Sequence, residues 1–478
     1  MKKMALILCF AMLLGLFGCT GGDAPATTTT GTVPTTTEQT GLGVPEAFSV
    51  GYAREDVTPK EDGVILDGWG DSSRRSEGVK DPICVTCVSL SDTEGNTALF
   101  YTLDFCSVKK SYTNAVRKEV SKETGVPVEN IYLVATHNHS APTCNSGSSS
   151  VAVQKAAIKT AKEALENRSA ATIEVSVAET KGLNFVRHYL TNKGTYVGDN
   201  YGIHTGVKAI AHETEADNDL QVIKFDREEG KDVVIVNFQA HPHLGASAKK
   251  ISSDIIGACR IEFEKKTDCH FAYFQGAAGN LNPSSYISSE NFTNDYAAHG
   301  KELARYAISA MNNNAVAVEP GPVKVVTETF TATVRKPSGE YASAAAAFMA
   351  EWNQSENREK AMAASGGIVH SNLAVGNMNM RNKMGDSTDF EINAVSIGDL
   401  GFVIAPYEMF DTQGMFIKEN SPFKMTFIMG YANDMNFYMP SELSFENGCY
   451  EVDNSYYIKG TAEALADRYV AMLQQLKG

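Results

Sequence analysis

The chain has 478 residues, of which 43% are hydrophobic and 21% are charged. These fractions are close to the averages of globular proteins, which excludes a disordered or a collagen-like chain. The length fits one large domain or two ordinary ones. The formal net charge of -15 predicts a surface that repels phosphate backbones, so we expect no nucleic-acid partner.

The N-terminus has the pattern of a bacterial export signal. Lys2 and Lys3 precede an apolar stretch over residues 5–16, and Cys19 follows a glycine. The segment resembles a lipobox, so we predict that residues 1–18 are a signal peptide and that Cys19 is acylated. Cleavage nearby, followed by plain secretion, is the alternative.

A polar segment rich in threonine, glycine and proline follows at residues 19–46. It cannot contribute to a core, so we predict a flexible, lipid-anchored linker. The linker would hold the protein outside the cytoplasm at the cell membrane, or the protein would be secreted if Cys19 carries no lipid. We expect the folded body to span residues 47–478, to begin near Phe48 and to be a monomer.

Strand-like and helix-like segments alternate along the first part of this body. The predicted strands lie at residues 83–90, 97–104, 131–136, 172–178, 220–225, 232–239 and 270–275, and the predicted helices at 112–123, 151–166, 255–265 and 295–312. The alternation predicts an α/β layered fold with a mixed sheet. An alanine-rich helical excursion is expected at residues 340–365. Further strands are expected at 389–397, 401–405 and 424–430, and an amphipathic helix at 460–476.

The spacing Cys84-x-x-Cys87 resembles half of a zinc knuckle or a redox motif. It lies in the strand-like run ICVTCVSL, where residues i and i+3 point to opposite faces. The chain has no second pair of this kind. We therefore interpret both residues as buried apolar cysteines. Seven cysteines remain outside the signal and position 19, and an odd number leaves at least one unpaired.

Two His-x-His pairs are the strongest chemical feature of the sequence. The chain has ten histidines, and chance placement gives about 0.2 such pairs. His137-x-His139 and His241-x-His243 each follow an apolar strand, and open α/β sheets place their ligands at the carboxyl ends of strands. Residues i and i+2 share a face, so each pair can aim two imidazoles at one metal ion. The alternative is that each pair only ends a strand in water.

A carboxylate follows another apolar strand near the end of the chain. GFVIAP runs into Tyr407 and Glu408, and a carboxylate in that place is a plausible third zinc ligand. By itself, Glu408 fits better as an ordinary acid at the start of a helix.

Six segments of the sequence resemble the neutral/alkaline ceramidase family, in the family's order. They are VGYAREDVTP at 50–59, ATHNHSAP at 135–142, FQAHP at 238–242, QGAAGNLNP at 275–283, APYEMF at 405–410 and GYANDMNFYMPSE at 430–442. The resemblance implies the family's N-terminal catalytic domain in a bacterial lipoprotein form. It also implies that the immunoglobulin-like C-terminal domain of the full enzymes is missing.

The resemblance implies one zinc ion per chain and a set of residues around it. His137, His241, Glu408 and Tyr438 would be the ligands, and spacing alone does not suggest the tyrosine. His139 would face the substrate carbonyl and act in catalysis together with Tyr438. Arg187, in NFVRHYL, would contact the substrate.

One position departs from the family. The ceramidases have a serine before the proline of the glycine-rich loop, whereas this chain has Asn282 before Pro283. Asparagine cannot serve as that nucleophile, and Ser284 and Ser285 are displaced along the chain. Asn282 can hydrogen-bond a substrate hydroxyl, or it can be a turn residue beside the proline.

We therefore predict a zinc-dependent hydrolase that cleaves an N-acyl amide bond of a lipid-like or other small-molecule substrate with zinc-activated water. The resemblance implies a place in sphingolipid metabolism. One alternative is hydrolysis of another extracellular amide or ester, derived from a glycan or the cell wall. The other is a lipoprotein that binds zinc and a ligand without turnover.

Overall fold

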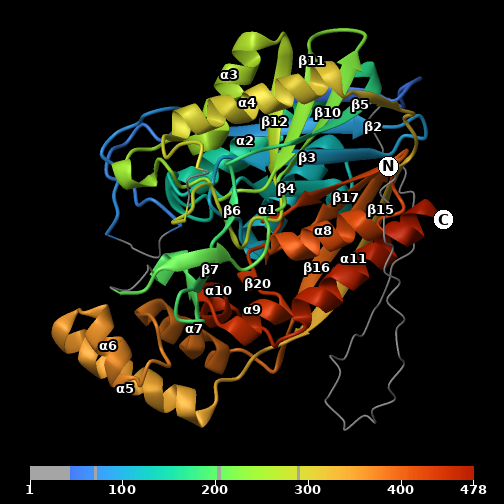
Figure 1. The fold of residues 1–478 in the computed structure, drawn as a ribbon. Coiled ribbons are helices and arrows are strands. Elements are labelled where there is room, and N and C mark those ends of the chain that lie inside the picture. Colours follow the sequence, from blue (N-terminus) through green and yellow to red (C-terminus); the bar gives the residue numbers. More distant parts are fainter. Residues whose placement is uncertain (1–42, 69–72, 202–205, 288–290) are drawn as a thin grey trace, which may run out of the picture.

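The computed structural model describes residues 43–68, 73–201, 206–287 and 291–478. The signal peptide, Cys19 and the linker up to residue 42 lie outside the described residues. In the described part, two β-sheets pack face to face between outer layers of helices (Figure 1). This arrangement confirms the predicted α/β layered fold and includes no immunoglobulin-like domain among the described residues.

The larger sheet has nine strands. Along its main path they are β12 (Cys269–Gln275), β11 (Asp232–Phe238), β10 (Asp219–Arg227), β5 (Ser169–Glu179), β1 (Ser49–Asp56), β2 (Cys84–Ser91), β3 (Thr97–Leu103) and β4 (Ile131–Ala135), and β14 (Val316–Val318) pairs with β5. The pairs β3–β4 and β11–β12 are parallel, whereas the remaining neighbours are antiparallel. The sheet is therefore mixed, as predicted.

The smaller sheet has four strands: β15 (Val323–Thr333), β16 (Ser387–Ile397), β17 (Leu400–Ile404) and β19 (Met425–Met429). Its inner face packs on the inner face of the larger sheet in one continuous core. The rings of Phe100 and Phe402, one from each sheet, have centroids 5.4 Å apart. Alternate residues of every strand enter this core, because successive side chains of a strand point to opposite faces.

Helices cover the outer face of each sheet. On the larger sheet, α1 (Lys110–Thr124) and α2 (Gly147–Glu166) cover β1 to β4, and α3 (Asp254–Lys266) and α4 (Tyr296–Asn313) cover β10 to β12. On the smaller sheet, the cover is α8 (Asp411–Asn420) and α11 (Thr461–Lys477). The apolar stripe of α11 is buried as its spacing predicts: Leu465, Tyr469, Leu473 and Leu476.

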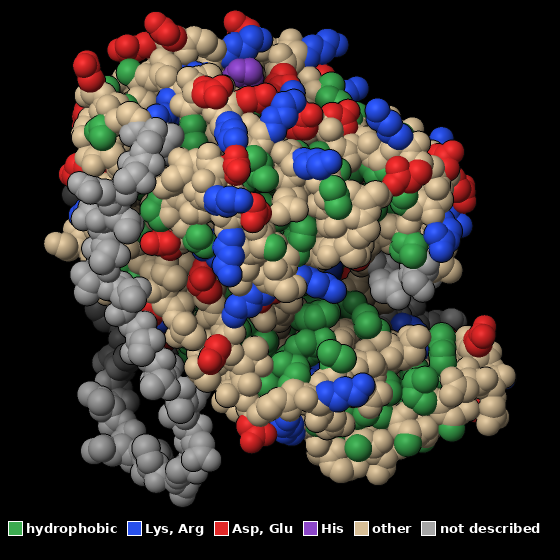
Figure 2. All heavy atoms as spheres, turned by 180° about the vertical axis from the view of Figure 1, so that it is seen from behind, with side chains coloured by type: hydrophobic (Ala, Val, Ile, Leu, Met, Phe, Trp, Pro, Cys, Tyr) green, Lys and Arg blue, Asp and Glu red, His purple; other side chains and the backbone are tan. Residues whose placement is uncertain are grey.

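The helical excursion predicted at residues 340–365 contains α5 (Gly339–Ser355) and α6 (Arg358–Ala364), and α7 (Asn372–Lys383), which lies beyond the predicted range, completes a separate lobe of three helices. It extends away from the sheets (Figure 1) around a small core of its own that includes Phe348 and Val375. Seen from behind, hydrophobic side chains gather on and beside this lobe, whereas basic and acidic side chains mix over the main body (Figure 2).

Short elements complete the structure at one end of the sheets. They are β6 (Phe185–Val186) paired with β13 (Leu281–Asn282), β18 (Glu408–Met409) paired with β20 (Tyr438–Met439), β7 (His188–Thr191) with β8 (Tyr196–Gly198) and β9 (Ala209–His212), and the helices α9 (Glu442–Asn447) and α10 (Tyr450–Asn454). Elements of two to six residues carry too little periodicity to be predicted from sequence.

Two further sequence predictions concern cysteines and membrane helices. The seven described cysteines are all buried and free, and Cys84 and Cys87 lie within β2, which agrees with their interpretation as apolar core residues. Among the described residues, no helix combines the length and the apolar character needed to cross a bilayer.

Candidate metal centre

The two histidine pairs meet because the larger sheet curls until its outer strands touch. β4 and β12 are the two ends of the main strand path, and they contact each other. His137 follows β4, and His241 follows β11, the neighbour of β12. The smaller sheet joins them where the backbone N–H of Ala135 donates to the carbonyl oxygen of Tyr431, at 3.2 Å. The site thus lies at the carboxyl ends of strands from both sheets.

His137, His241 and Glu408 point three ligand atoms at one position. The Nε2 atoms of the two histidines are 3.2 Å apart. The Oε2 atom of Glu408 lies 3.4 Å from Nε2 of His137 and 3.5 Å from Nε2 of His241. Two ligands at the 2.0–2.1 Å zinc bond length, in tetrahedral arrangement, lie about 3.3 Å apart. The three spacings therefore match one edge each of a zinc coordination tetrahedron.

The backbone fixes which nitrogen of each histidine faces this position. His137 donates from Nδ1 to the carbonyl oxygen of Cys106 at 2.9 Å, and His241 donates from Nδ1 to that of Leu281 at 3.1 Å. Each Nε2 atom then keeps its lone pair for a metal, in the arrangement that outer partners impose on zinc-binding histidines. Burial lowers the pKa of His137 to about 3 and that of His241 well below its ordinary value, so both rings are neutral.

Glu408 is the acidic member of the group and is 2% exposed. Burial raises the pKa of its carboxyl to about 8, although the nearby Arg187, Tyr438 and Tyr431 oppose this change. Its Oε2 atom is buried and accepts no hydrogen bond from the described residues. A buried carboxylate oxygen without a donor is costly unless a cation compensates it. The donor set, the spacing and this oxygen all fit a bound zinc ion.

Glu408 does not sit where an ordinary helix acid would. It belongs to β18, and the following helix, α8, begins only at Asp411. The alternative interpretation of Glu408 as an acid at the start of a helix is therefore wrong.

The backbone around the site adopts left-handed conformations that side chains rarely take. His137 has φ 63°, Tyr431 φ 58°, Asn433 φ 61° and Phe437 φ 57°. Such residues cost about 1–3 kcal/mol each and persist where the surrounding structure holds them, commonly at functional sites. Tyr431 is one of these residues, and its ring stacks on the His137 imidazole with ring centroids 4.1 Å apart.

His139 lies beside this group. Its ring centroid is 4.7 Å from that of His137 and 5.7 Å from that of His241. Gly68, with φ 98°, packs over it so closely that a Cβ atom there would lie 2.7 Å from the His139 ring. Cys106 also lies nearby, where its sulfur forms a second close group of possible ligand atoms with His137 and His139, and burial raises the pKa of its thiol well above the ordinary value.

Tyr438 is in register with Glu408 in the parallel pair β18–β20. Its hydroxyl is near enough to the Glu408 carboxyl to lower that group's pKa. The guanidinium of Arg187 lies 5.5 Å from the centre of its ring. The tyrosine implied by the resemblance thus borders the three-atom group.

Arg187 and Asn282 meet on the same side of the site. The guanidinium donates to Oδ1 of Asn282 at 3.3 Å and to the carbonyl oxygen of Gly279 at 2.8 Å. Asn282 lies in β13, where it pairs with Phe185 of β6. Its amide also donates to the Asp199 carboxylate. The residues predicted as metal ligands, catalytic groups and substrate contacts therefore lie in or next to one cluster: His137, His139, Arg187, His241, Asn282, Glu408 and Tyr438.

Comparisons with known proteins agree with this fold. Residues 48–279 match the family model described as neutral/alkaline non-lysosomal ceramidase, N-terminal. Over this range the chain is similar to the neutral/alkaline ceramidase family. The matched range contains both histidine pairs and Arg187, whereas Glu408 and Tyr438 lie beyond it.

Two solved structures resemble the fold of this chain over most of its length. One is a neutral ceramidase from Pseudomonas aeruginosa, with a TM-score of 0.68 and 17% identity, covering 90% of this chain and 74% of that one. The other is a ceramidase complexed with C2, with a TM-score of 0.68 and 16% identity, covering 90% and 75%. No curated protein matches the chain by sequence.

Sequence reasoning missed a second buried cluster in this chain. Behind Arg187, the side chains of His188, Glu213 and Glu451 are almost completely buried and joined by hydrogen bonds. They come from three distant parts of the chain, and no spacing motif connects them. The feature that marks these three residues is the burial of their charged side chains. The sequence alone does not show that a charged residue is buried.

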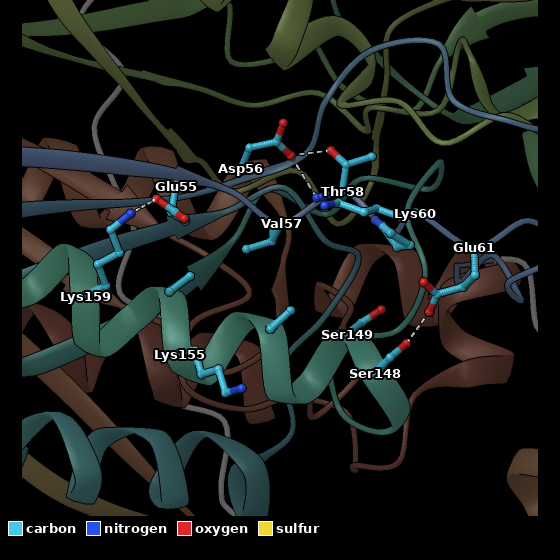
Figure 3. A pocket seen from close by; sticks show the side chains of 13 residues that line it. Glu55, Asp56, Val57, Thr58, Lys60, Glu61, Ser148, Ser149, Lys155 and Lys159 are labelled. Carbon is cyan, nitrogen blue, oxygen red and sulfur yellow. Dashed lines mark hydrogen bonds and ion pairs between the residues drawn. The ribbon is translucent and has the colours of Figure 1, made fainter.

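A surface pocket of about 400 Å³ lies at the start of α2, and its lining contains no residue of the metal centre (Figure 3). Several of its charged groups already have partners. Lys159 pairs with Glu55, and Ser148 donates to Glu61. The residues predicted to bind metal and substrate lie at the histidine cluster and not at this pocket.

Proposed function

We propose that this chain is a zinc-dependent hydrolase of an amide bond in an N-acylated, lipid-like substrate. The observation that carries the proposal is the meeting of His137, His241 and Glu408, with ligand atoms 3.2–3.5 Å apart. The similarity of residues 48–279 to the neutral/alkaline ceramidase family supports amide hydrolysis as the reaction class.

His137, His241, Glu408 and Tyr438 would hold the metal. When bound, zinc supplies Lewis-acid activation of water and polarisation of the scissile carbonyl. The chain keeps both imidazoles neutral and orients them through their Nδ1 hydrogen bonds. It also supplies one carboxylate, whose negative charge compensates part of the charge of the cation.

The neighbouring side chains would orient the substrate and handle its proton. His139, neutral because burial lowers its pKa well below the ordinary value, would donate a hydrogen bond to the carbonyl oxygen as negative charge develops there. Arg187 and Asn282 would contact polar groups of the substrate beside the reacting carbonyl.

A substrate panel tests this function. Purified protein is assayed against N-acyl sphingoid bases, glycan- and cell-wall-derived amides, and simple esters, each with and without a chelator. We expect chelator-sensitive hydrolysis of N-acyl amides. Preference for a cell-wall amide or an ester would support the first alternative and overturn the lipid-like substrate. Binding without turnover on any member would overturn the enzyme assignment.

Serine replacements separate water attack from serine attack. Ser285 is the serine to examine, because its Oγ lies 3.1 Å from Nε2 of His212. We expect Ser284→Ala and Ser285→Ala each to retain most turnover, and serine-directed covalent inhibitors to leave activity intact. Asn282→Ser is expected to shift preference toward ceramide by restoring the family's hydroxyl. Loss of activity in Ser285→Ala would contradict the water mechanism, and turnover that appears only in Asn282→Ser would mark the wild type as a zinc-retaining binder.

Membrane attachment is proposed to depend on Cys19. A single acyl chain binds membranes only marginally, whereas several chains anchor stably. We expect wild-type protein to sediment with membranes and Cys19→Ala to appear in the soluble fraction. Cys269→Ala, which alters a buried cysteine in β12, is the control and should stay with the membranes. Wild-type protein found wholly soluble would leave plain secretion as the explanation.

A further inference from the structure

Four buried charged side chains form a continuous line that ends at the metal centre. Nδ1 of His188 lies 3.0 Å from Oε2 of Glu213, and Nε2 of His188 lies 2.5 Å from Oε2 of Glu451. The other oxygen of Glu451 accepts from Nε of Arg187 at 2.5 Å. Each of these four side chains is at most 3% exposed.

We propose that Glu213, His188 and Glu451 are positioning residues that hold the Arg187 guanidinium in place beside the metal centre. This inference rests on the proposed function, because it assigns the role of the line through Arg187. In this role, Glu213, His188 and Glu451 act through Arg187 and do not contact the substrate themselves.

His188, Cys449 and Glu451 lie close enough together to suggest a second metal site, but their geometry and charge argue against it. A separation of 2.5 Å between Nε2 of His188 and Oε2 of Glu451 is that of a direct hydrogen bond, whereas ligands of one zinc ion lie about 3.3 Å apart.

The charges of the line also balance without a metal. Burial alone would raise the pKa of Glu451, but Arg187 and His188 lower it to about 2. Burial alone would likewise lower the pKa of His188, but Cys449, Glu451 and Glu213 raise it well above its ordinary value. Two cations therefore face two anions, and buried charges are tolerated when they are paired in this way.

The far end of the line is anchored to the protein frame. Glu213 accepts hydrogen bonds from Oγ of Ser444 and Nδ2 of Asn447, both at 2.7 Å and both from α9. Its backbone N–H donates to the carbonyl oxygen of His188 at 2.9 Å. Glu451 lies on α10, which contacts β20, the strand of Tyr438 (Figure 1).

The near end of the line fixes the plane of the guanidinium. Nε of Arg187 is held by Glu451, one Nη by Asn282 and the other by the carbonyl oxygen of Gly279. A guanidinium has five N–H donors in a rigid fork. The remaining N–H groups can donate to the Tyr438 hydroxyl and to a substrate oxygen. Glu451 and Tyr438 both raise the pKa of Arg187. Holding such a donor before the substrate arrives is how positioning groups increase rate.

A double-mutant cycle tests the line through its far end. Glu213→Gln keeps the size of the side chain and does not touch Arg187, and we expect it to lower kcat/KM by about 10- to 100-fold. The zinc content should stay at that of the wild type. In an Arg187→Ala background, Glu213→Gln should cause no further loss, because the line acts only through the arginine. Glu328→Gln removes another buried carboxylate, paired with Arg468 and remote from this line, and should leave kcat/KM unchanged.

Losses that multiply in the double variant, or an unchanged kcat/KM in Glu213→Gln, would overturn the proposal. If Glu213→Gln does not fold, Asn447→Ala removes one hydrogen bond from the same carboxylate and should give a smaller loss that also vanishes with Arg187→Ala.

Histidine-selective ¹⁵N NMR provides a measurement that needs no activity. We expect both ring nitrogens of His188 to be protonated near neutral pH, to stay unchanged when zinc is added to metal-free protein, and to shift in Glu213→Gln but not in Glu328→Gln. A zinc-dependent shift at His188 would overturn the proposal in favour of a second metal site. Absence of hydrolysis in the wild type would count against the proposed function alone, and the NMR result would then decide the role of the line.

Discussion

Replacing His137 or His241 by alanine is expected to remove the bound zinc and to lower amide hydrolysis by at least about 10³-fold. Each replacement removes one of three atoms that lie 3.2–3.5 Å from one another. A zinc site with fewer protein ligands binds far less tightly. The Lewis acid contributes several kcal/mol of transition-state stabilisation, and each 1.36 kcal/mol is a factor of ten in rate.

Elemental analysis and the amide assay, on the same preparations, measure this effect. His270→Ala is the matched control, because that histidine is half-buried against the Tyr52 ring, with centroids 4.3 Å apart, and lies outside the cluster. It should keep one zinc per chain and full activity. Zinc retained at one per chain in both His137→Ala and His241→Ala would contradict the proposed ligand set.

His139→Ala is expected to separate metal binding from catalysis. The His139 ring lies beside the group formed by His137, His241 and Glu408 and supplies none of that group's three ligand atoms. Zinc should therefore remain at one per chain, while kcat falls by about 10²–10³, the usual cost of removing one oxyanion donor. Gly68→Ala should likewise retain zinc and lower kcat, because a Cβ atom there would lie 2.7 Å from the His139 ring and displace that ring.

Zinc content and kcat, measured on the same samples, decide between two roles of His139. Loss of zinc together with activity would make it a ligand. Unchanged kcat with zinc retained would remove it from the mechanism.

The long elements of the fold were predictable, whereas their division into two sheets was not. β4 is an uninterrupted apolar run, β11 is apolar except for Asp232 and Asn237, and their predicted ends lie within one residue of the observed ones. The order of strands depends on pairings between distant segments: Ser49 of β1 pairs with both Ser91 and Ala170. Nothing local to β1 specifies those partners, and the curling that joins β4 to β12 follows from them.

The same reasoning explains which site residues could be found. His137, His241 and Glu408 each follow an apolar strand, so patterning indicates that they share one edge of the fold. Tyr438 carries no such pattern and was indicated only by resemblance to the ceramidases. The partners of Arg187 were not predictable, because His188 and Glu451 are 263 residues apart and their sequence surroundings predict exposed charges.

Anomalous diffraction at the zinc absorption edge, from crystals of the purified protein, tests the central claim most directly. A single peak is expected within about 2.0–2.2 Å of Nε2 of His137, Nε2 of His241 and a carboxylate oxygen of Glu408. A peak at His188, Cys449 and Glu451 instead, or no peak from protein that hydrolyses the amide substrate, would contradict the account.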